Sequence, residues 1–173
     1  MTDGLKKYEE DWNLRYLNLT DPSLIESSLS EASLEALNKV INSFPDVDPK
    51  IISFTGDTFI GNLIYNYLIT TFMESKFIRT KCVRITNSWQ YDSIRELSRS
   101  TYDMRLLDNL EFSLYNNIQK EALNNYIETI YNQTKLIILN VPSSEDWEFA
   151  PKSLQKLISN HSLNILIKSK GTI

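Results

Sequence analysis

The stretch Lys50-Ile-Ile-Ser-Phe-Thr-Gly56-Asp-Thr-Phe-Ile-Gly61-Asn62-Leu63 decides how the rest of this sequence is interpreted. It opens with a short apolar run, residues 51–54, which is typical of a buried strand. Two glycines then follow five residues apart, in a chain that holds only four glycines among 173 residues. A mostly apolar stretch with helical spacing comes next. We therefore expect a strand, a loop from Thr55 to Gly61, and a helix from Asn62 to Ser75.

Short apolar runs and helical patterns alternate along the rest of the chain. Strands are predicted at Lys81–Ile85, Leu136–Leu139 and Leu163–Ile167. Helices are predicted at Leu34–Phe44, residues 91–107, Glu111–Tyr131 and a segment that ends near Ser159. Strands that alternate with helices indicate a parallel sheet with right-handed crossovers. We therefore expect an α/β fold, a three-layer sandwich with a mainly parallel sheet.

The composition excludes several classes of protein. With 42% hydrophobic residues, the chain can fold as one domain with a core, and we expect a single α/β domain over residues 21–173 after an N-terminal arm, residues 1–20. The net charge of −4 argues against a basic nucleic-acid-binding surface. The single cysteine excludes an intramolecular disulfide and a cysteine-based zinc site. No apolar run approaches the ~18 residues that cross a bilayer, and the N-terminus has no secretory signal pattern, so we expect a cytoplasmic or nuclear protein without membrane contact.

The glycine pair carries a resemblance to a known motif. Residues Gly56 to Leu63 have the spacing of the phosphate-binding loop, Gly-x4-Gly-Lys-[Ser/Thr], and occur in its context of strand, turn and helix. That loop directs backbone N–H groups at phosphates, while its lysine neutralises charge and its hydroxyl holds Mg²⁺. Here Asn62 stands at the lysine position and Leu63 at the hydroxyl position. The run Leu136–Asn140 similarly resembles the apolar strand that ends in a carboxylate in these proteins, with Asn140 at the acid position.

From about Lys50 to the C-terminus the chain therefore resembles P-loop NTPase domains of the RecA-like or AAA-type branch, and the choice between the two stays open. The resemblance implies a degenerate phosphate loop, formed by Gly56, Asp57, Thr58, Gly61, Asn62 and Leu63, together with the degenerate acid position Asn140. It implies a pseudo-NTPase: not an enzyme, with no catalytic residue, no cofactor and no metal. The alternative is an unrelated doubly wound sheet whose glycines only make the turn.

The aromatic residues indicate a role in protein contacts. Trp12, Trp89 and Trp147 lie outside the apolar strands, and such side chains are enriched at the centres of interfaces. We expect a subunit or adaptor whose partners are related P-loop subunits or a second copy, with nucleic acid contacted only indirectly or weakly. The alternative function is a small-molecule or nucleotide-binding enzyme. Its ligand would lie at the carboxyl ends of the strands, near residues 55–62, 86–89 and 140–146.

Overall fold

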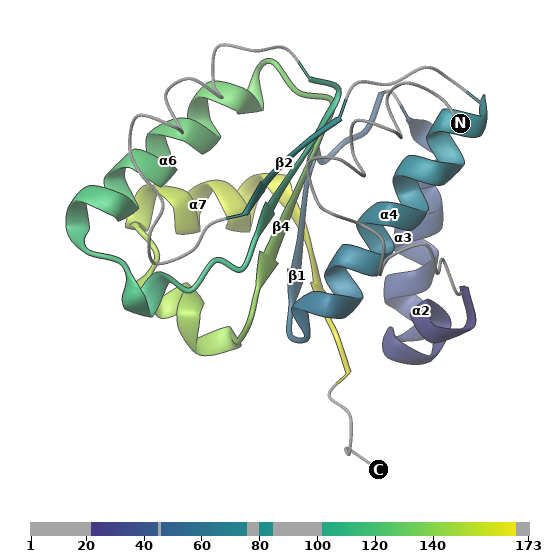
Figure 1. The fold of residues 1–173 in the computed structure, drawn as a ribbon, viewed down its shortest axis with the longest axis horizontal. Coiled ribbons are helices and arrows are strands. Elements are labelled where there is room, and N and C mark those ends of the chain that lie inside the picture. Colours follow the sequence, from purple (N-terminus) through teal and green to yellow (C-terminus); the bar gives the residue numbers. More distant parts are fainter. Residues whose placement is uncertain (1–21, 45, 76–79, 85–101, 169–173) are drawn as a thin grey trace.

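The computed structural model describes residues 22–44, 46–75, 80–84 and 102–168, and these form an α/β sandwich around one parallel sheet (Figure 1). The five strands are β1 (Ile51–Thr55), β2 (Thr80–Arg84), β3 (Met104–Asp108), β4 (Leu136–Val141) and β5 (Ser162–Leu166). Their order across the sheet is β2-β3-β4-β1-β5, and every neighbouring pair is parallel. All five carboxyl ends therefore lie at one edge of the sheet, where ligand sites of open parallel sheets occur.

Helices cover both faces of this sheet (Figure 1). One face carries α2 (Pro22–Ser28), α3 (Glu31–Ser43) and α4 (Thr58–Ser75). The other carries α6 (Asn117–Tyr131), α7 (Lys152–His161) and two short 3₁₀ segments, η2 (Phe112–Leu114) and η3 (Ser144–Phe149). The predicted three-layer α/β sandwich with a parallel sheet is therefore confirmed. In the described part of the chain, no helix is both long and apolar enough to cross a membrane.

The core is divided by the sheet into two hydrophobic clusters. Every residue of β1, β3 and β4 is buried, as expected for strands covered on both faces. Alternate residues therefore serve opposite layers: Ile52 and Ile138 pack under α2, α3 and α4, whereas Ile51 and Ile137 pack under α6 and α7. Continuous apolar strands are what this arrangement requires.

Local sequence signals explain where two of the helices begin. The Ser30 side chain accepts from the backbone N–H of Ser33 and caps α3. Asn116 and Gln119 form a reciprocal capping box at the start of α6, so the helix begins six residues later than the predicted Glu111. The intervening chain forms η2 instead.

The prediction of a helix over residues 91–107 is wrong in its last part, because Met104–Asp108 forms β3. Arg105 interrupts the apolar run and makes it resemble a helix face. In the structure this arginine is fully buried, donates to the Tyr126 hydroxyl at 3.0 Å and lies over the Tyr102 ring. The start of the predicted helix, and the predicted arm 1–20, lie outside the described residues.

Candidate phosphate-loop site

The first glycine of the pair makes a turn that no other residue fits. Gly56 follows β1 directly and has a φ of 133°, in the region that L side chains rarely adopt. Its N–H donates to the Val141 carbonyl at 2.9 Å, which ties the turn to the end of β4. A Cβ at this position would lie 3.0 Å from the Cβ of Ile167. Backbone conformation and close packing therefore both require glycine here.

Asp57 closes the turn, and α4 begins directly after it at Thr58, three residues before the second glycine. Its carboxylate accepts the backbone N–H of Phe59 at 2.9 Å, and its carbonyl accepts those of Ile60 and Gly61 at 3.1 and 3.3 Å. Residues 58–61 are therefore helical, and the predicted loop from Thr55 to Gly61 shrinks to Gly56 and Asp57. Three of the N–H groups that a phosphate loop offers to its ligand, those of Phe59, Ile60 and Gly61, are thus engaged by Asp57.

The second glycine allows α4 to approach β4. A Cβ on Gly61 would lie 2.2 Å from the Asn140 Oδ1 and 2.6 Å from its Cγ. Asn140 is completely buried, and its Oδ1 has no hydrogen-bond partner. Gly61 is therefore explained by the contact between helix and strand.

Three polar side chains meet beneath the start of α4, at the carboxyl ends of β3 and β4. The Asn62 Nδ2 donates to one carboxylate oxygen of Asp108 at 3.3 Å, and the Asn140 Nδ2 lies 3.3 Å from the other. The same Asn140 Nδ2 lies 3.3 Å from the Asn62 Oδ1. All three residues are buried. We call Asn62, Asp108 and Asn140 the buried polar triad.

Asp108 is the residue that sequence reasoning missed. The prediction considered only Asn140 as the acid position, whereas the neighbouring strand β3 places the Asp108 carboxylate beside both asparagines. The available signal was the pair Leu106-Leu107 followed by an acid, which is a short version of an apolar strand ending in a carboxylate. Among the described residues, no group of three or more His, Cys, Asp or Glu side chains could hold a metal ion.

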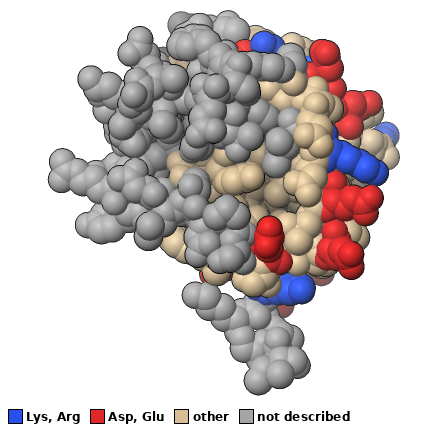
Figure 2. All heavy atoms as spheres, turned by 90° about the vertical axis from the view of Figure 1, so that its right-hand side faces the viewer, with Lys and Arg blue, Asp and Glu red and all other residues tan. Residues whose placement is uncertain are grey.

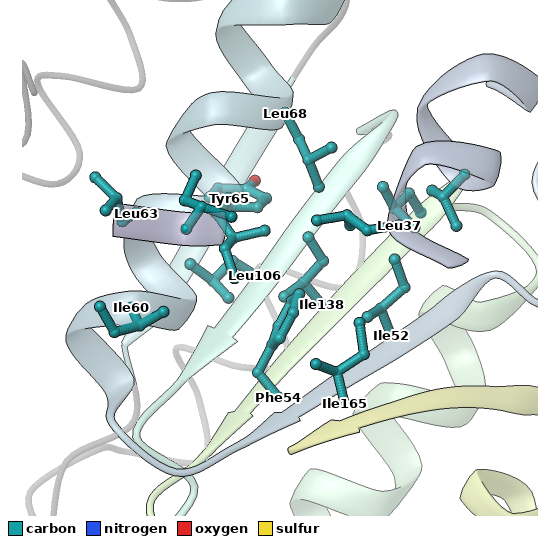
Figure 3. Close-up of a cluster of buried hydrophobic side chains, with 14 of the residues drawn as sticks. Leu37, Ile52, Phe54, Ile60, Leu63, Tyr65, Leu68, Leu106, Ile138 and Ile165 are labelled. Carbon is teal, nitrogen blue, oxygen red and sulfur yellow. The ribbon is translucent and has the colours of Figure 1, made fainter. Parts of the chain in front are cut away.

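Leu63 belongs to the hydrophobic core. It is buried in the cluster beneath α2, α3 and α4, together with Ile60 and Leu68 of the same helix (Figure 3). The position at which a phosphate loop presents its hydroxyl to Mg²⁺ therefore contributes to the packing of α4 on the sheet.

The tryptophans proposed as interface residues are only partly described. Trp12 and Trp89 lie outside the described residues. Trp147, on η3, is half-buried: its Nε1 donates to the Thr55 Oγ1 at 3.0 Å, and its ring centroid is 5.7 Å from that of Phe112. One ring edge is thus fixed to β1, and the rest of the side chain remains partly accessible.

Comparison with known proteins identifies the fold. No family model and no curated protein matches the sequence. Among solved structures, the chain is similar to the DnaC helicase loader, with a TM-score of 0.59 and 17% identity over 79% of this chain and 89% of that one. It is also similar to AMPPCP-bound DnaA from Aquifex aeolicus, with a TM-score of 0.56 and 13% identity over 78% of this chain and 45% of that one.

A third similar structure is the replication initiator DnaA bound to AMPPCP and single-stranded DNA, with a TM-score of 0.59 and 11% identity over 88% of this chain and 52% of that one. The chain therefore spans about half the length of both DnaA structures. All three are AAA+ proteins, so of the two branches left open by the sequence, the structural neighbours lie in the AAA-type branch. At these low identities the similarity concerns the fold alone, and this chain has a P-loop NTPase-like fold.

Proposed function

We propose that the chain is a catalytically inactive, P-loop-derived domain that serves as a subunit or adaptor in a protein assembly. Phosphoryl transfer depends on positioning and on neutralisation of charge, which a phosphate loop achieves with a lysine, a hydroxyl on Mg²⁺ and open N–H groups. Asn62 carries no charge, Leu63 has no oxygen, and Asp57 engages the N–H groups. The residues of this site therefore favour loss of the reaction.

The charges of the site support the same proposal. The site consists of Gly56–Leu63 and the buried polar triad. It contains two ionisable side chains, Asp57 and Asp108, and both are acidic. A nucleoside triphosphate placed at the start of α4 would meet the Asp57 carboxylate at the point where a phosphate loop offers positive potential. The ion pair between Lys135 and Asp103 precedes β3 and β4 at the opposite edge of the sheet, so it contributes no positive charge here.

The adaptor role rests on one observation: large exposed apolar side chains occur in the elements that begin or end at the carboxyl edge of the sheet. Within the part of the chain that the structure describes, the large hydrophobic residues that are about half exposed or more are Phe59, Leu114, Ile118, Phe149 and Leu166. Phe59, Leu114 and Phe149 lie in the first element that follows β1, β3 or β4. Leu166 ends β5, and Ile118 lies in the first turn of α6. Exposed apolar side chains of this kind mark surfaces that another protein covers.

Surface charge favours a protein partner over nucleic acid. The helical layer formed by α2 and α3 presents the exposed acidic residues Glu26, Glu31 and Glu35, and acidic side chains predominate among the described charged residues on this face (Figure 2). Binding to a phosphate backbone depends on lysine and arginine. The structural neighbours include a helicase loader and a replication initiator, and we propose that this chain serves in an assembly of related P-loop subunits or of its own copies, with nucleic acid contacted through them.

Nucleotide titration tests the loss of activity. The full chain is titrated with ATP and with GTP in the presence of Mg²⁺, and heat, thermal stability and phosphate release are measured. A ligand at a hundredfold excess over its Kd stabilises a fold by about 2.7 kcal/mol, which a thermal assay detects readily. We expect no binding, no shift in Tm and no phosphate release. Micromolar binding of either nucleotide would refute the proposal.

Association measurements test the adaptor role separately. The tagged full chain is expressed in its native host and purified together with the proteins that bind it. The mass and stoichiometry of the purified complex are then determined. The double variant Phe59→Ser/Phe149→Ser should lose the partner, whereas Asn42→Ser, an exposed change on α3, should keep it. A chain that stays monomeric at all concentrations and purifies without a stoichiometric partner contradicts this role.

A further inference from the structure

A groove on the α7 face of the sheet is not used by the phosphate-loop site. Its volume is about 300 Å³, and it lies between η3, α7 and the carboxyl ends of β1 and β5. Thr55 and Asn164 line it from the strands, Gln155 and Ile158 from α7, and Trp147 from η3. The sheet separates these side chains from the buried polar triad, because Asn62 belongs to α4, on the other face. The size lies at the lower end of the range for small-molecule sites.

The lining has no ionisable side chain, although it is rich in polar groups. Serine hydroxyls, two carboxamides, a threonine and an indole surround an aliphatic patch formed by Ile158 and Leu166. Transfer of a charged group into such a site is unfavourable because no opposite charge compensates the loss of hydration. An uncharged ligand is therefore the complementary occupant.

Two carboxamides offer opposite hydrogen-bonding groups. The Asn164 Oδ1 accepts from the Ser53 hydroxyl, which leaves its Nδ2 to donate. The Gln155 Nε2 donates to the Ala150 carbonyl at 2.9 Å, which leaves its Oε1 to accept. A ligand that carries both an acceptor and a donor is therefore complementary to the two carboxamides.

The indole of Trp147 supplies an aromatic wall. Its Nε1 bond to Thr55 and its contact with Phe112 fix the ring, and the side chain remains partly accessible at the groove. A fixed aromatic ring favours a flat partner through stacking and apolar contact. We propose that this groove binds an uncharged aromatic ring that carries an amide edge, as nicotinamide and uracil do. Binding there uses no residue of Gly56–Leu63, and it shares Leu166 with the exposed apolar residues on which the adaptor role rests.

Matched pairs of probes test the proposal on the full chain. Nicotinamide and uracil are compared with nicotinate and orotate, their carboxylate-bearing counterparts, by chemical-shift titration. We expect the neutral probes to bind with a Kd of about 1 mM or tighter, as their size allows, and the charged ones at least about tenfold more weakly.

Variants place the binding in the groove. Ser159→Trp and Ser144→Trp insert a large side chain from α7 and from η3, and each should weaken the neutral probes by about tenfold or more. Ser153→Trp is the matched control, because Ser153 is also exposed on α7 but does not line the groove. The proposal would be overturned if charged and neutral probes bound equally, or if none bound at about 10 mM. It would also be overturned if all three variants had equal effects.

Discussion

Replacement of Gly61 by alanine tests whether the second glycine serves the packing of α4 on β4. The added Cβ would lie 2.2 Å from the Asn140 Oδ1, well inside contact distance. Asn140 cannot move away without cost, because it is fully buried and its Nδ2 contacts both Asn62 and Asp108 at 3.3 Å. Either the side chain leaves its partners or α4 shifts from the sheet.

The expected effect combines three contributions. Overpacking of a tight interior costs about 2 kcal/mol, and loss of the two hydrogen bonds of Asn140 costs about 1 kcal/mol each. Alanine in place of glycine within a helix raises the free energy of unfolding by about 1 kcal/mol. The free energy of unfolding should therefore fall by about 3 kcal/mol in the Gly61→Ala variant.

A double-mutant cycle with Asn140→Ala isolates the contact. Without the Asn140 carboxamide there is no clash, so Gly61→Ala should then stabilise the fold by about 1 kcal/mol, a reversal of sign. Urea unfolding followed by circular dichroism measures all four proteins. Asn125→Ala, an exposed change on α6, serves as the control for helix propensity. A neutral or stabilising Gly61→Ala in the parent chain, or equal effects in both backgrounds, would refute the reasoning.

Three further substitutions address the core and the site. Leu63→Thr should lower the free energy of unfolding by about 2–3 kcal/mol in urea denaturation, because it places a hydroxyl in the apolar cluster, and it should confer no Mg²⁺-dependent ATP binding in calorimetry. Tyr126→Phe should cost about 1–3 kcal/mol in the same assay, because it removes the hydroxyl that accepts from buried Arg105, and a neutral result would refute a supporting role. Burial raises the pKa of Tyr115 above its ordinary value of 10.0. Its contribution to the free energy of unfolding is therefore complete below about pH 10 and falls above that pH by about 1.4 kcal/mol per pH unit. Tyr115→Phe should flatten that alkaline decline in chemical unfolding, and an unchanged slope would contradict the assignment.

The elements that could be predicted from the sequence are those whose residues share one environment. The apolar runs of β1 and β4 are buried on both faces, and α4 is apolar over most of its length, so each produces an uninterrupted signal. The start of α4 could not be placed, because Asp57 was interpreted as part of a loop, whereas its carboxylate and carbonyl organise a helical turn. Local capping, rather than apolar periodicity, determines that boundary.

Strand β3 shows why the candidate site was only half predicted. Its second residue is Arg105, a residue type that is rarely buried unless paired, and its partner Tyr126 lies 21 residues away on another element. With β3 assigned to a helix, Asp108 had no place at the carboxyl edge, and Asn140 alone represented the acid position. The sequence lacks two pieces of tertiary-structure information: which strand pairs with β4, and which neutral side chains contact the buried charge of Arg105.

The two glycines have structural causes that do not involve a phosphate. Gly56 is required by a positive φ and by Ile167, and Gly61 by the side chain of Asn140. The spacing that resembles a phosphate loop therefore follows from the join between β1 and α4 in this fold, whether or not a nucleotide binds. What distinguishes a working site is the chemistry around the glycines, and here it consists of Asp57 at the start of the helix and the buried polar triad, Asn62, Asp108 and Asn140. Function at this edge must accordingly be inferred from those side chains and from the exposed apolar residues around them, rather than from the glycine spacing.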